Sequence, residues 1–194
     1  MELQILDAIQ TIRTPILDRL MCFITSLGSA GRVWILLAVI LLIFPKLRKS
    51  GVIILAALVV DLILCNGILK NLVGRTRPFD VNTSVSILIN KPRDFSFPSG
   101  HTAVSFAAVA ALFFSGEKKL WKISLVAAVL IAFSRLYLYV HYPTDILGGI
   151  VVGILARLHR IPGCRLASDI HIASCRSGTI TKCLICHDPG KDQS

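Results

Sequence analysis

The sequence predicts an all-α membrane protein, a polytopic bundle of about six transmembrane helices. Of the 194 residues, 54% are hydrophobic and only 16% are charged, and the mean hydropathy is +0.72. Apolar runs long enough to cross a hydrocarbon layer of about 30 Å recur along the chain. We expect six spans, at residues 15–27, 33–44, 51–69, 101–114, 123–140 and 146–158.

The N-terminal elements are an interfacial helix and two apolar segments. Residues 1–15 carry apolar side chains at helical spacing, which predicts an amphipathic helix at the membrane surface. The next segment contains Asp18 and Arg19, so it is the weakest predicted span. A glycine-containing turn at residues 28–31 separates it from the second span, which Pro45 ends.

The later segments carry signs of close helix packing. Residues 101–114 are rich in alanine, and Gly149 and Gly153 lie one turn apart in the last segment, so both favour tight helix contacts. Asp61 falls inside the third span, where a carboxylate needs a partner within the bundle. Residues 70–97 form the longest polar segment between two spans.

Short basic stretches predict the orientation. Positively charged short loops remain in the cytoplasm, and here they lie at residues 46–49, 118–122 and 157–160. With six spans, both termini are then cytoplasmic, while the polar segment 70–97 and the junction 134–145 share the outer face. Loss of the weak first span would move the N-terminus outside without moving these polar residues.

Composition excludes some functions. The net charge of +10 lies largely between apolar runs and in the tail, which fits contact with anionic lipid headgroups rather than with nucleic acid. No cleavable signal peptide is evident. We expect one membrane domain, residues 1–160, followed by a flexible polar tail, residues 161–194, that contains cysteines. Cys22 and Cys65 lie in apolar spans, where cysteine is usually a small buried hydrophobe.

A first polar cluster follows the third span and contains Lys70, Arg75, Arg77 and Pro78. A lysine at the end of a membrane helix is commonly an anchor at the interface. The two arginines favour anion binding instead, because a guanidinium can bind two phosphate oxygens at once.

A second cluster, Pro98-Ser99-Gly100-His101, precedes the fourth span. Ser99 suits an N-cap, and the free N–H groups of a helix start can bind phosphate. Gly100 lets the backbone approach closely, and His101 would lie beside the anion. The alternative is a simple helix cap with an incidental histidine.

The third cluster, residues 134–145, contains Arg135, His141, Pro143 and Asp145. Pro143 predicts the first turn of a helix, with His141 just outside it and Asp145 inside it. A carboxylate there can orient one imidazole nitrogen and leave the other free to attack. The alternative is again a polar cap. Ionisable groups at the centre of a membrane helix cost about 2.5–3.5 kcal/mol each, so they tend to mark function.

Together the clusters resemble the three signature motifs of the type 2 phosphatidic acid phosphatase (PAP2) family, which shares its core with vanadium haloperoxidases. The matching residues are Lys70-x6-Arg77-Pro78, Pro98-Ser99-Gly100-His101 and Ser134-Arg135-x5-His141-x3-Asp145. The resemblance covers residue 70 to about residue 158, and the preceding spans suit the six-helix membrane members.

The resemblance implies a role for each matching residue. His141 corresponds to the nucleophile that forms a phosphohistidine, Asp145 to the residue that orients it, and His101 to the acid that protonates the leaving oxygen. The phosphate-binding set corresponds to Lys70, Arg77, Ser99, Gly100 and Arg135. No metal or other cofactor is implied. Zinc binding by His101, His141 and Asp145 is a poorer interpretation, because zinc sites rarely need so many cations around them.

The implied activity is hydrolysis of a lipid phosphate or diphosphate, and the favoured substrate is undecaprenyl diphosphate. Phosphatidic acid and phosphatidylglycerophosphate are alternatives within the family. A lipid phosphotransferase and a non-catalytic protein that binds anionic lipids or transports a small anion remain open. The expected location is a bacterial cell membrane with the site on the extracytoplasmic side.

The tail contains two further patterns. Cys183-Leu184-Ile185-Cys186-His187 has the form of a c-type haem attachment site, and His171, Cys175, Cys183 and Cys186 form a possible zinc set. Neither is favoured, since haem attachment is extracytoplasmic and only one cysteine pair is tightly spaced.

Overall fold

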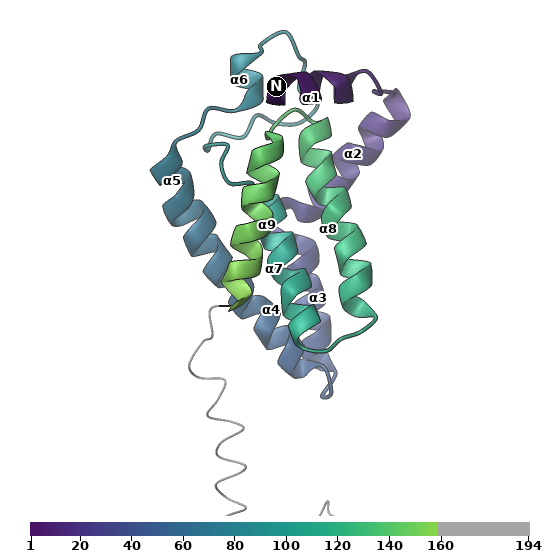
Figure 1. Ribbon diagram of the computed structural model, residues 1–194. Coiled ribbons are helices and arrows are strands. Elements are labelled where there is room, and N and C mark those ends of the chain that lie inside the picture. Colours follow the sequence, from purple (N-terminus) through teal and green to yellow (C-terminus); the bar gives the residue numbers. More distant parts are fainter. Residues whose placement is uncertain (159–194) are drawn as a thin grey trace, which may run out of the picture. The chain divides into compact units, whose positions relative to one another are not determined.

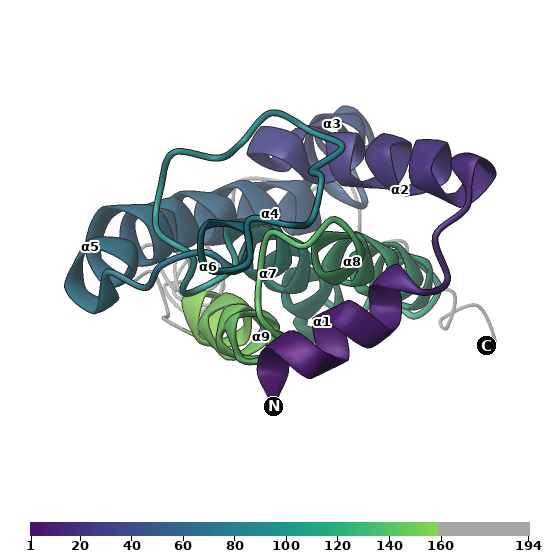
Figure 2. The same cartoon turned by 90° about the horizontal axis from the view of Figure 1, so that it is seen from above.

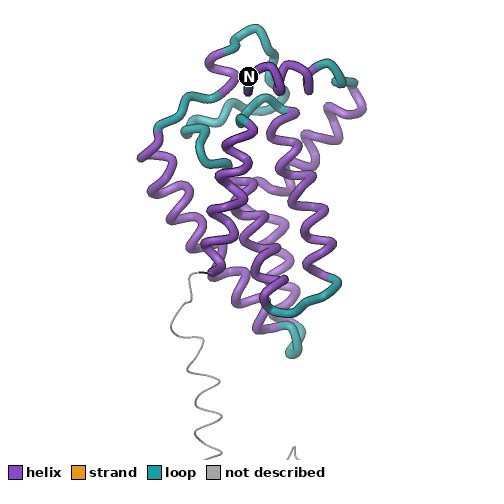
Figure 3. Tube along the Cα trace, viewed as in Figure 1, coloured by secondary structure: helices purple, strands orange, loops and turns teal. Residues whose placement is uncertain are grey.

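The computed structural model describes residues 1–158, which form helices joined by turns and loops with no strand among them (Figures 1 and 3). The predicted all-α class is confirmed. The elements are α1 (Glu2–Gln10), α2 (Pro15–Gly28), η1 (Ser29–Gly31), α3 (Arg32–Ile43), α4 (Arg48–Asp61), η2 (Leu62–Leu69), α5 (Lys70–Val73), α6 (Pro78–Val81), α7 (Gly100–Phe114), α8 (Leu120–Tyr137) and α9 (Pro143–Leu158).

The described helices have the lengths and surfaces of membrane spans. Three stretches are long and apolar enough to cross a bilayer: Pro15–Ile43, Arg48–Val81 and Leu120–Tyr137. Two shorter apolar helices accompany them, Gly100–Phe114 and Pro143–Ala156. Large apolar side chains such as Leu36 of α3, Val126 of α8 and Leu147 of α9 face outward. Such surfaces are stable in lipid, so the chain is an integral membrane protein.

The first two predicted spans run together in the structure. Thr14 caps α2 by accepting a hydrogen bond from Leu17 N at 3.2 Å. The predicted turn at residues 28–31 is a kink, with Ala30 and Gly31 at φ +52° and +67°. Because α3 continues from α2 towards the lower end of Figure 1, residues 15–43 form one candidate span rather than an antiparallel pair.

The N-terminus consequently differs from the six-span prediction. Helix α1 lies across the upper end of the bundle in Figure 1, over α8 and α9 when seen from above (Figure 2). Glu2 accepts hydrogen bonds from Thr144, and Asp7 accepts one from Tyr139 Oη at 2.7 Å. The N-terminus thus lies at the same end as the polar junction, as expected if residues 15–27 do not cross separately.

Helices α4, η2 and α5 form one continuous helical stretch, and its middle part, η2, is π-helical. Asp61 ends α4 with its side chain fully buried, and neither carboxylate oxygen has a hydrogen-bond partner in the described residues. The predicted partner inside the bundle is therefore not found there. Cys65 of η2 is buried with a free thiol, as expected, whereas Cys22 is half-buried.

Helix α7 is the packing centre, with α4, α8 and α9 around it. Small residues make its contact with α9 close. A Cβ atom at Gly153 would lie 2.3 Å from the carbonyl oxygen of Ala103, and one at Gly149 would lie 2.7 Å from that of Ser99. The predicted tight contact at these two glycines is confirmed.

The helices bring the predicted polar segments to one end. The turns α3–α4 and α7–α8 lie at the lower end of Figure 1, whereas residues 82–97 and the loop 138–142 lie at the upper end with α1. We call this the upper end. The residues of the haem and zinc hypotheses, 171–187, lie outside the described part of the chain.

Candidate active site

A cavity of about 690 Å³ opens within the bundle below the upper end. One part of its wall is apolar and includes Ile35, Leu58 and Leu62. The other part is polar and carries residues from all three sequence clusters: Lys70, Arg77, Asp94, Gly100, His101, Arg135 and His141. The expected convergence of the two histidines is therefore observed, since both line one cavity.

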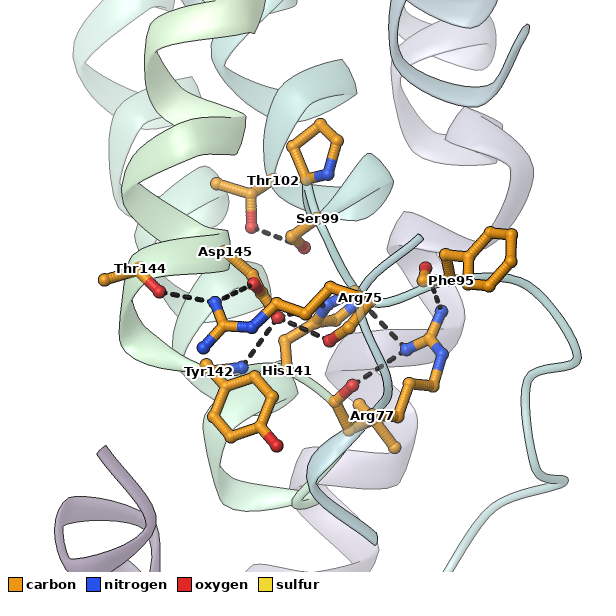
Figure 4. Close-up of polar contacts among 12 residues, drawn as sticks. Arg75, Arg77, Phe95, Ser99, Thr102, His141, Tyr142, Thr144 and Asp145 are labelled. Atoms are coloured by element: carbon orange, nitrogen blue, oxygen red, sulfur yellow. Dashed lines mark hydrogen bonds and ion pairs between the residues drawn. The ribbon is translucent and has the colours of Figure 1, made fainter. Parts of the chain in front are cut away.

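His141 lies in the loop before α9, and Asp145 lies in the first turn of that helix, as predicted from Pro143. Nδ1 of His141 lies 3.4 Å from Oδ2 of Asp145, and both side chains are at most 1% exposed. Nε2 lies 3.3 Å from Nη1 of Arg77 (Figure 4). Because a guanidinium can only donate, Nε2 is the acceptor and the ring proton belongs on Nδ1, facing the carboxylate.

The environment of His141 favours the neutral imidazole. Burial lowers the pKa of His141, and the charges of Arg135 and Arg77 act in the same direction against the opposing effect of Asp145. A neutral ring with a lone pair on Nε2 is the nucleophilic form of histidine. The geometry therefore turns the acceptor nitrogen of a neutral imidazole towards the cationic side of the cavity.

The carboxylate of Asp145, which lies beside His141, accepts hydrogen bonds from several other groups. Oδ2 accepts hydrogen bonds from Ser96 Oγ at 2.5 Å and from the backbone N–H of Tyr142 at 2.9 Å, and Oδ1 accepts one from Arg75 Nη1 at 2.7 Å. The side chain is fully buried, so its position is fixed by these contacts and not by water.

Arg75 connects this carboxylate to the N-terminal helix. Its Nη1 lies 2.6 Å from Oγ1 of Thr144, and its guanidinium stacks 3.9 Å above the ring of Tyr142 (Figure 4). Its Nη2 lies 2.5 Å from Oε2 of Glu2. Sequence reasoning placed Arg75 in the first cluster without a separate role and gave Glu2 none. The signal was weak, because these two residues are 73 positions apart.

Lys70 and Arg77 share one carboxylate that the sequence prediction missed. Lys70 Nζ donates to Oδ2 of Asp94, and Arg77 Nη2 donates to Oδ1 at 2.6 Å. Burial alone would raise the pKa of Asp94, but the hydrogen bond and charge of Lys70, together with Arg77, lower it to about 2. Asp94 thus remains an anion between two cations throughout the neutral range.

Arg135, from α8, is a buried cation with few partners. Its side chain is 3% exposed. Nη1 donates to Thr25 Oγ1 at 2.5 Å, while Nε has no hydrogen-bond partner among the described residues. A buried guanidinium with an unsatisfied donor beside a cavity is prepared to bind an anion.

The start of α7 supplies backbone donors, and Ser99 is its N-cap residue. Its hydroxyl does not cap the helix but accepts a hydrogen bond from Thr102 Oγ1 at 3.0 Å. A Cβ atom at Gly100 would lie 3.6 Å from Lys70 Nζ, so this glycine lies against the cation. Nε2 of His101 lies 3.5 Å from Oγ of Ser29.

Six of the eight predicted site residues therefore line the cavity, whereas Ser99 and Asp145 do not. Among residues 1–158, no group of three or more His, Cys, Asp or Glu side chains is placed to hold a metal ion. The geometry is that of an anion-binding cavity with one oriented imidazole and a second histidine in its wall.

Comparison with known proteins assigns this geometry to a family. Residues 50–161 match the model of the PAP2 superfamily. The chain belongs to the PAP2 superfamily. This confirms the resemblance of the three motifs, and it makes the protein a membrane phosphatase of the PAP2 type that acts on lipid phosphates or diphosphates.

Relatives and a solved structure agree with the family. The chain is 33% identical to an undecaprenyl-diphosphatase of Sulfolobus acidocaldarius over 71% of its own length and 66% of that protein. It is 35% identical to undecaprenyl-diphosphatase BcrC of Bacillus subtilis, with coverage of 72% and 71%. The crystal structure of a transmembrane PAP2-type phosphatidylglycerolphosphate phosphatase from Bacillus subtilis matches with a TM-score of 0.66 and 29% identity, over 88% of this chain and 85% of that one.

Proposed function

We propose that this PAP2 protein hydrolyses a lipid diphosphate, with undecaprenyl diphosphate as the favoured substrate, through a phosphohistidine formed on His141. The observation that carries the proposal is the orientation of His141, whose Nε2 faces Arg77 and the cavity while Nδ1 faces Asp145. A neutral Nε2 whose lone pair faces the cationic side of the cavity is the form of histidine that attacks phosphorus.

The charges of the cavity suit a phosphate group. Its lining carries three cations, Lys70, Arg77 and Arg135, and one carboxylate, Asp94, which leaves an excess of two positive charges. The net positive charge of the lining favours a bound anion such as phosphate. The N–H groups in the first turn of α7 and the unsatisfied Nε of Arg135 supply further donors. We assign phosphate binding to Lys70, Arg77, Gly100 and Arg135, with Ser99 supporting the helix start.

The reaction has two balanced steps. In the first, Nε2 of His141 bonds to phosphorus as the bond to the leaving oxygen breaks, and His101 protonates that oxygen. In the second, His101 takes a proton from water, the water oxygen bonds to phosphorus, and the P–N bond breaks to release inorganic phosphate. Asp145 stabilises the imidazolium that forms.

The shape of the cavity supports a lipid substrate. Its apolar wall, from α3, α4 and η2, includes Val59 and Leu62, whose side chains are more than half exposed on the outer surface of the bundle. The polar end of the cavity would hold the phosphate group of a lipid, and this apolar wall would contact its tail. Relatives named undecaprenyl-diphosphatase favour the diphosphate.

The orientation is proposed from the distribution of charge. The basic loops at residues 46–49 and 118–122 lie at the lower end, opposite the cavity opening. Basic short loops remain cytoplasmic, so the site faces the outer side of the cell membrane. Alkaline phosphatase fused after residue 85 should be active, and the same fusion after residue 117 should be inactive. The reverse pattern would contradict this orientation.

Phosphate release by the purified protein tests the function. The substrates are undecaprenyl diphosphate, phosphatidylglycerophosphate and phosphatidic acid, each in detergent with EDTA. We expect the highest kcat/KM with the diphosphate, inhibition by vanadate, and loss of activity in His141→Ala. A preference for either glycerophospholipid would reject the substrate while retaining the reaction. An active His141→Ala variant would reject the mechanism, and release to an added alcohol in preference to water would indicate a phosphotransferase.

A further inference from the structure

Asp94 occupies a position that a phosphate group would also occupy. Its two carboxylate oxygens contact Lys70 and Arg77 separately, one oxygen on each cation. Two oxygens of a phosphate can make the same pair of charge-assisted hydrogen bonds. The carboxylate and a bound phosphate therefore compete for the same donors.

The carboxylate of Asp94 is more exposed than the two cations that it contacts. The side chains of Lys70 and Arg77 are 8% and 3% exposed, whereas that of Asp94 is 50% exposed. Asp94 belongs to the irregular segment between α6 and α7 and lines the cavity. The carboxylate can therefore turn into solvent, while the two cations are confined by the bundle.

The backbone around Asp94 is anchored independently of its carboxylate. Arg77 Nε donates to the carbonyl oxygen of Asp94 at 2.8 Å, and Ser96 N donates to the carbonyl oxygen of Arg75 at 2.8 Å. A further hydrogen bond joins Arg77 Nη1 to the carbonyl oxygen of Val140 at 2.8 Å. If the carboxylate leaves, Arg77 keeps these backbone contacts and its place in the cavity.

We propose that Asp94 is an internal competitor for the phosphate-binding position, bound to Lys70 and Arg77 in the free enzyme and displaced by the phosphate of the substrate. The residue lowers the affinity for phosphate groups and, by returning to the cations, speeds release of inorganic phosphate. The inference depends on the proposed function only in assigning Lys70 and Arg77 to phosphate. The exchange is non-covalent, because one set of hydrogen bonds to the two cations replaces the other.

Equilibrium binding of orthovanadate and inorganic phosphate tests this directly. Titration calorimetry on the full chain in detergent compares wild type with Asp94→Asn and Asp94→Ala. The matched control is Asp80→Asn, which removes an exposed carboxylate from α6, on the same segment between α5 and α7. We expect both Asp94 variants to bind the two anions about ten- to a hundredfold more tightly, since a charge-assisted contact no longer has to be broken. Asp80→Asn should stay within about twofold of wild type.

Turnover of the lipid substrate gives a second measure. KM should fall in both Asp94 variants, and inorganic phosphate should become a stronger product inhibitor. Asp94→Glu keeps the charge, so its anion affinity should lie closer to wild type than that of Asp94→Asn.

Three results would overturn the inference. Unchanged affinity would show that the carboxylate does not compete, and weaker affinity would show that it holds the cations in a binding geometry. Misfolding of both neutral variants, seen in the thermal midpoint, would make Asp94 a required structural clamp. Tighter vanadate binding in a protein that hydrolyses no lipid diphosphate would support the role of Asp94 and reject the proposed function.

Discussion

Arg75 Nη1 lies 2.7 Å from Oδ1 of Asp145, the carboxylate oxygen that does not face His141. Arg75 does not line the cavity, so it touches neither the proposed substrate nor the proposed nucleophile. Its contact fixes the rotation of the carboxylate and hence the direction of the hydrogen bond available to His141 Nδ1. Arg75 is in this sense a positioning residue for the proposed reaction.

Replacement of Arg75 should therefore act on turnover. In Arg75→Leu we expect kcat to fall about ten- to a hundredfold, the usual effect of removing a residue that orients another, with KM changed less than threefold. Arg75→Lys should recover part of kcat because it retains one charged donor. Steady-state kinetics on the lipid substrate measure both quantities, and a rise in KM at constant kcat would contradict the assignment.

Glu2 acts on the same carboxylate through Arg75, so its effect should depend on that residue. We expect Glu2→Gln to lower kcat about two- to fivefold, because it weakens one charged contact of the guanidinium. In Arg75→Leu the further change of Glu2 should have almost no effect, since the connection is already lost. A double-mutant cycle in kcat measures the coupling. Multiplicative losses would show that α1 acts by another route.

The contact between α7 and α9 should be sensitive to one added side chain. The Cβ atom of Gly153→Val would lie 2.3 Å from the Ala103 carbonyl oxygen, which forces the helices apart. Overpacking of this kind costs about 1–3 kcal/mol, and we expect a lower thermal midpoint together with reduced activity. Gly67→Ala is the matched control, because a Cβ atom there meets nothing within 4 Å. Equal stability of the two variants would contradict the packing described.

The contact of Asp94 should not depend on pH in the working range. The pKa of Asp94 is lowered to about 2, so its carboxylate stays ionised above that value, and the contact is lost only as pH falls towards 2. The ratio of phosphate affinities between Asp94→Asn and wild type should therefore be constant from about pH 5 to about pH 8.5. Calorimetric titration at several pH values measures this ratio, in which the ionisation of phosphate itself cancels. A ratio that falls between pH 8 and pH 5 would show that the pKa of Asp94 is raised rather than lowered.

Much of the site was predictable because its residues stand at fixed positions relative to helix ends. Pro143 located the start of α9 and so placed His141 and Asp145 correctly. The alternation of apolar spans and polar connections placed the three clusters at one end. Gly149 and Gly153 predicted a close helix contact because only their lack of a side chain permits it.

The features that the sequence did not predict depend on contacts between distant residues, which leave no local sequence pattern. Asp94 lies in an irregular segment without periodicity, so its approach to Lys70 and Arg77 could not be read from spacing. The run from α2 into α3 depends on two left-handed residues, Ala30 and Gly31, and only the second is of a type that suggests such a conformation. Asp61 was expected to find a partner and has none among the described residues, although Lys70 lies close enough to affect it electrostatically.

The glycine contact between α7 and α9 has a mechanical consequence. The backbones of α7 and α9 are in direct contact there. The two helices, which carry His101 and Asp145, are therefore held rigidly against each other. Lys70 begins α5, which continues directly from the π-helical stretch η2. The contact between α7 and α9 therefore keeps His101 and Asp145, and with Asp145 the ring of His141, at a fixed separation.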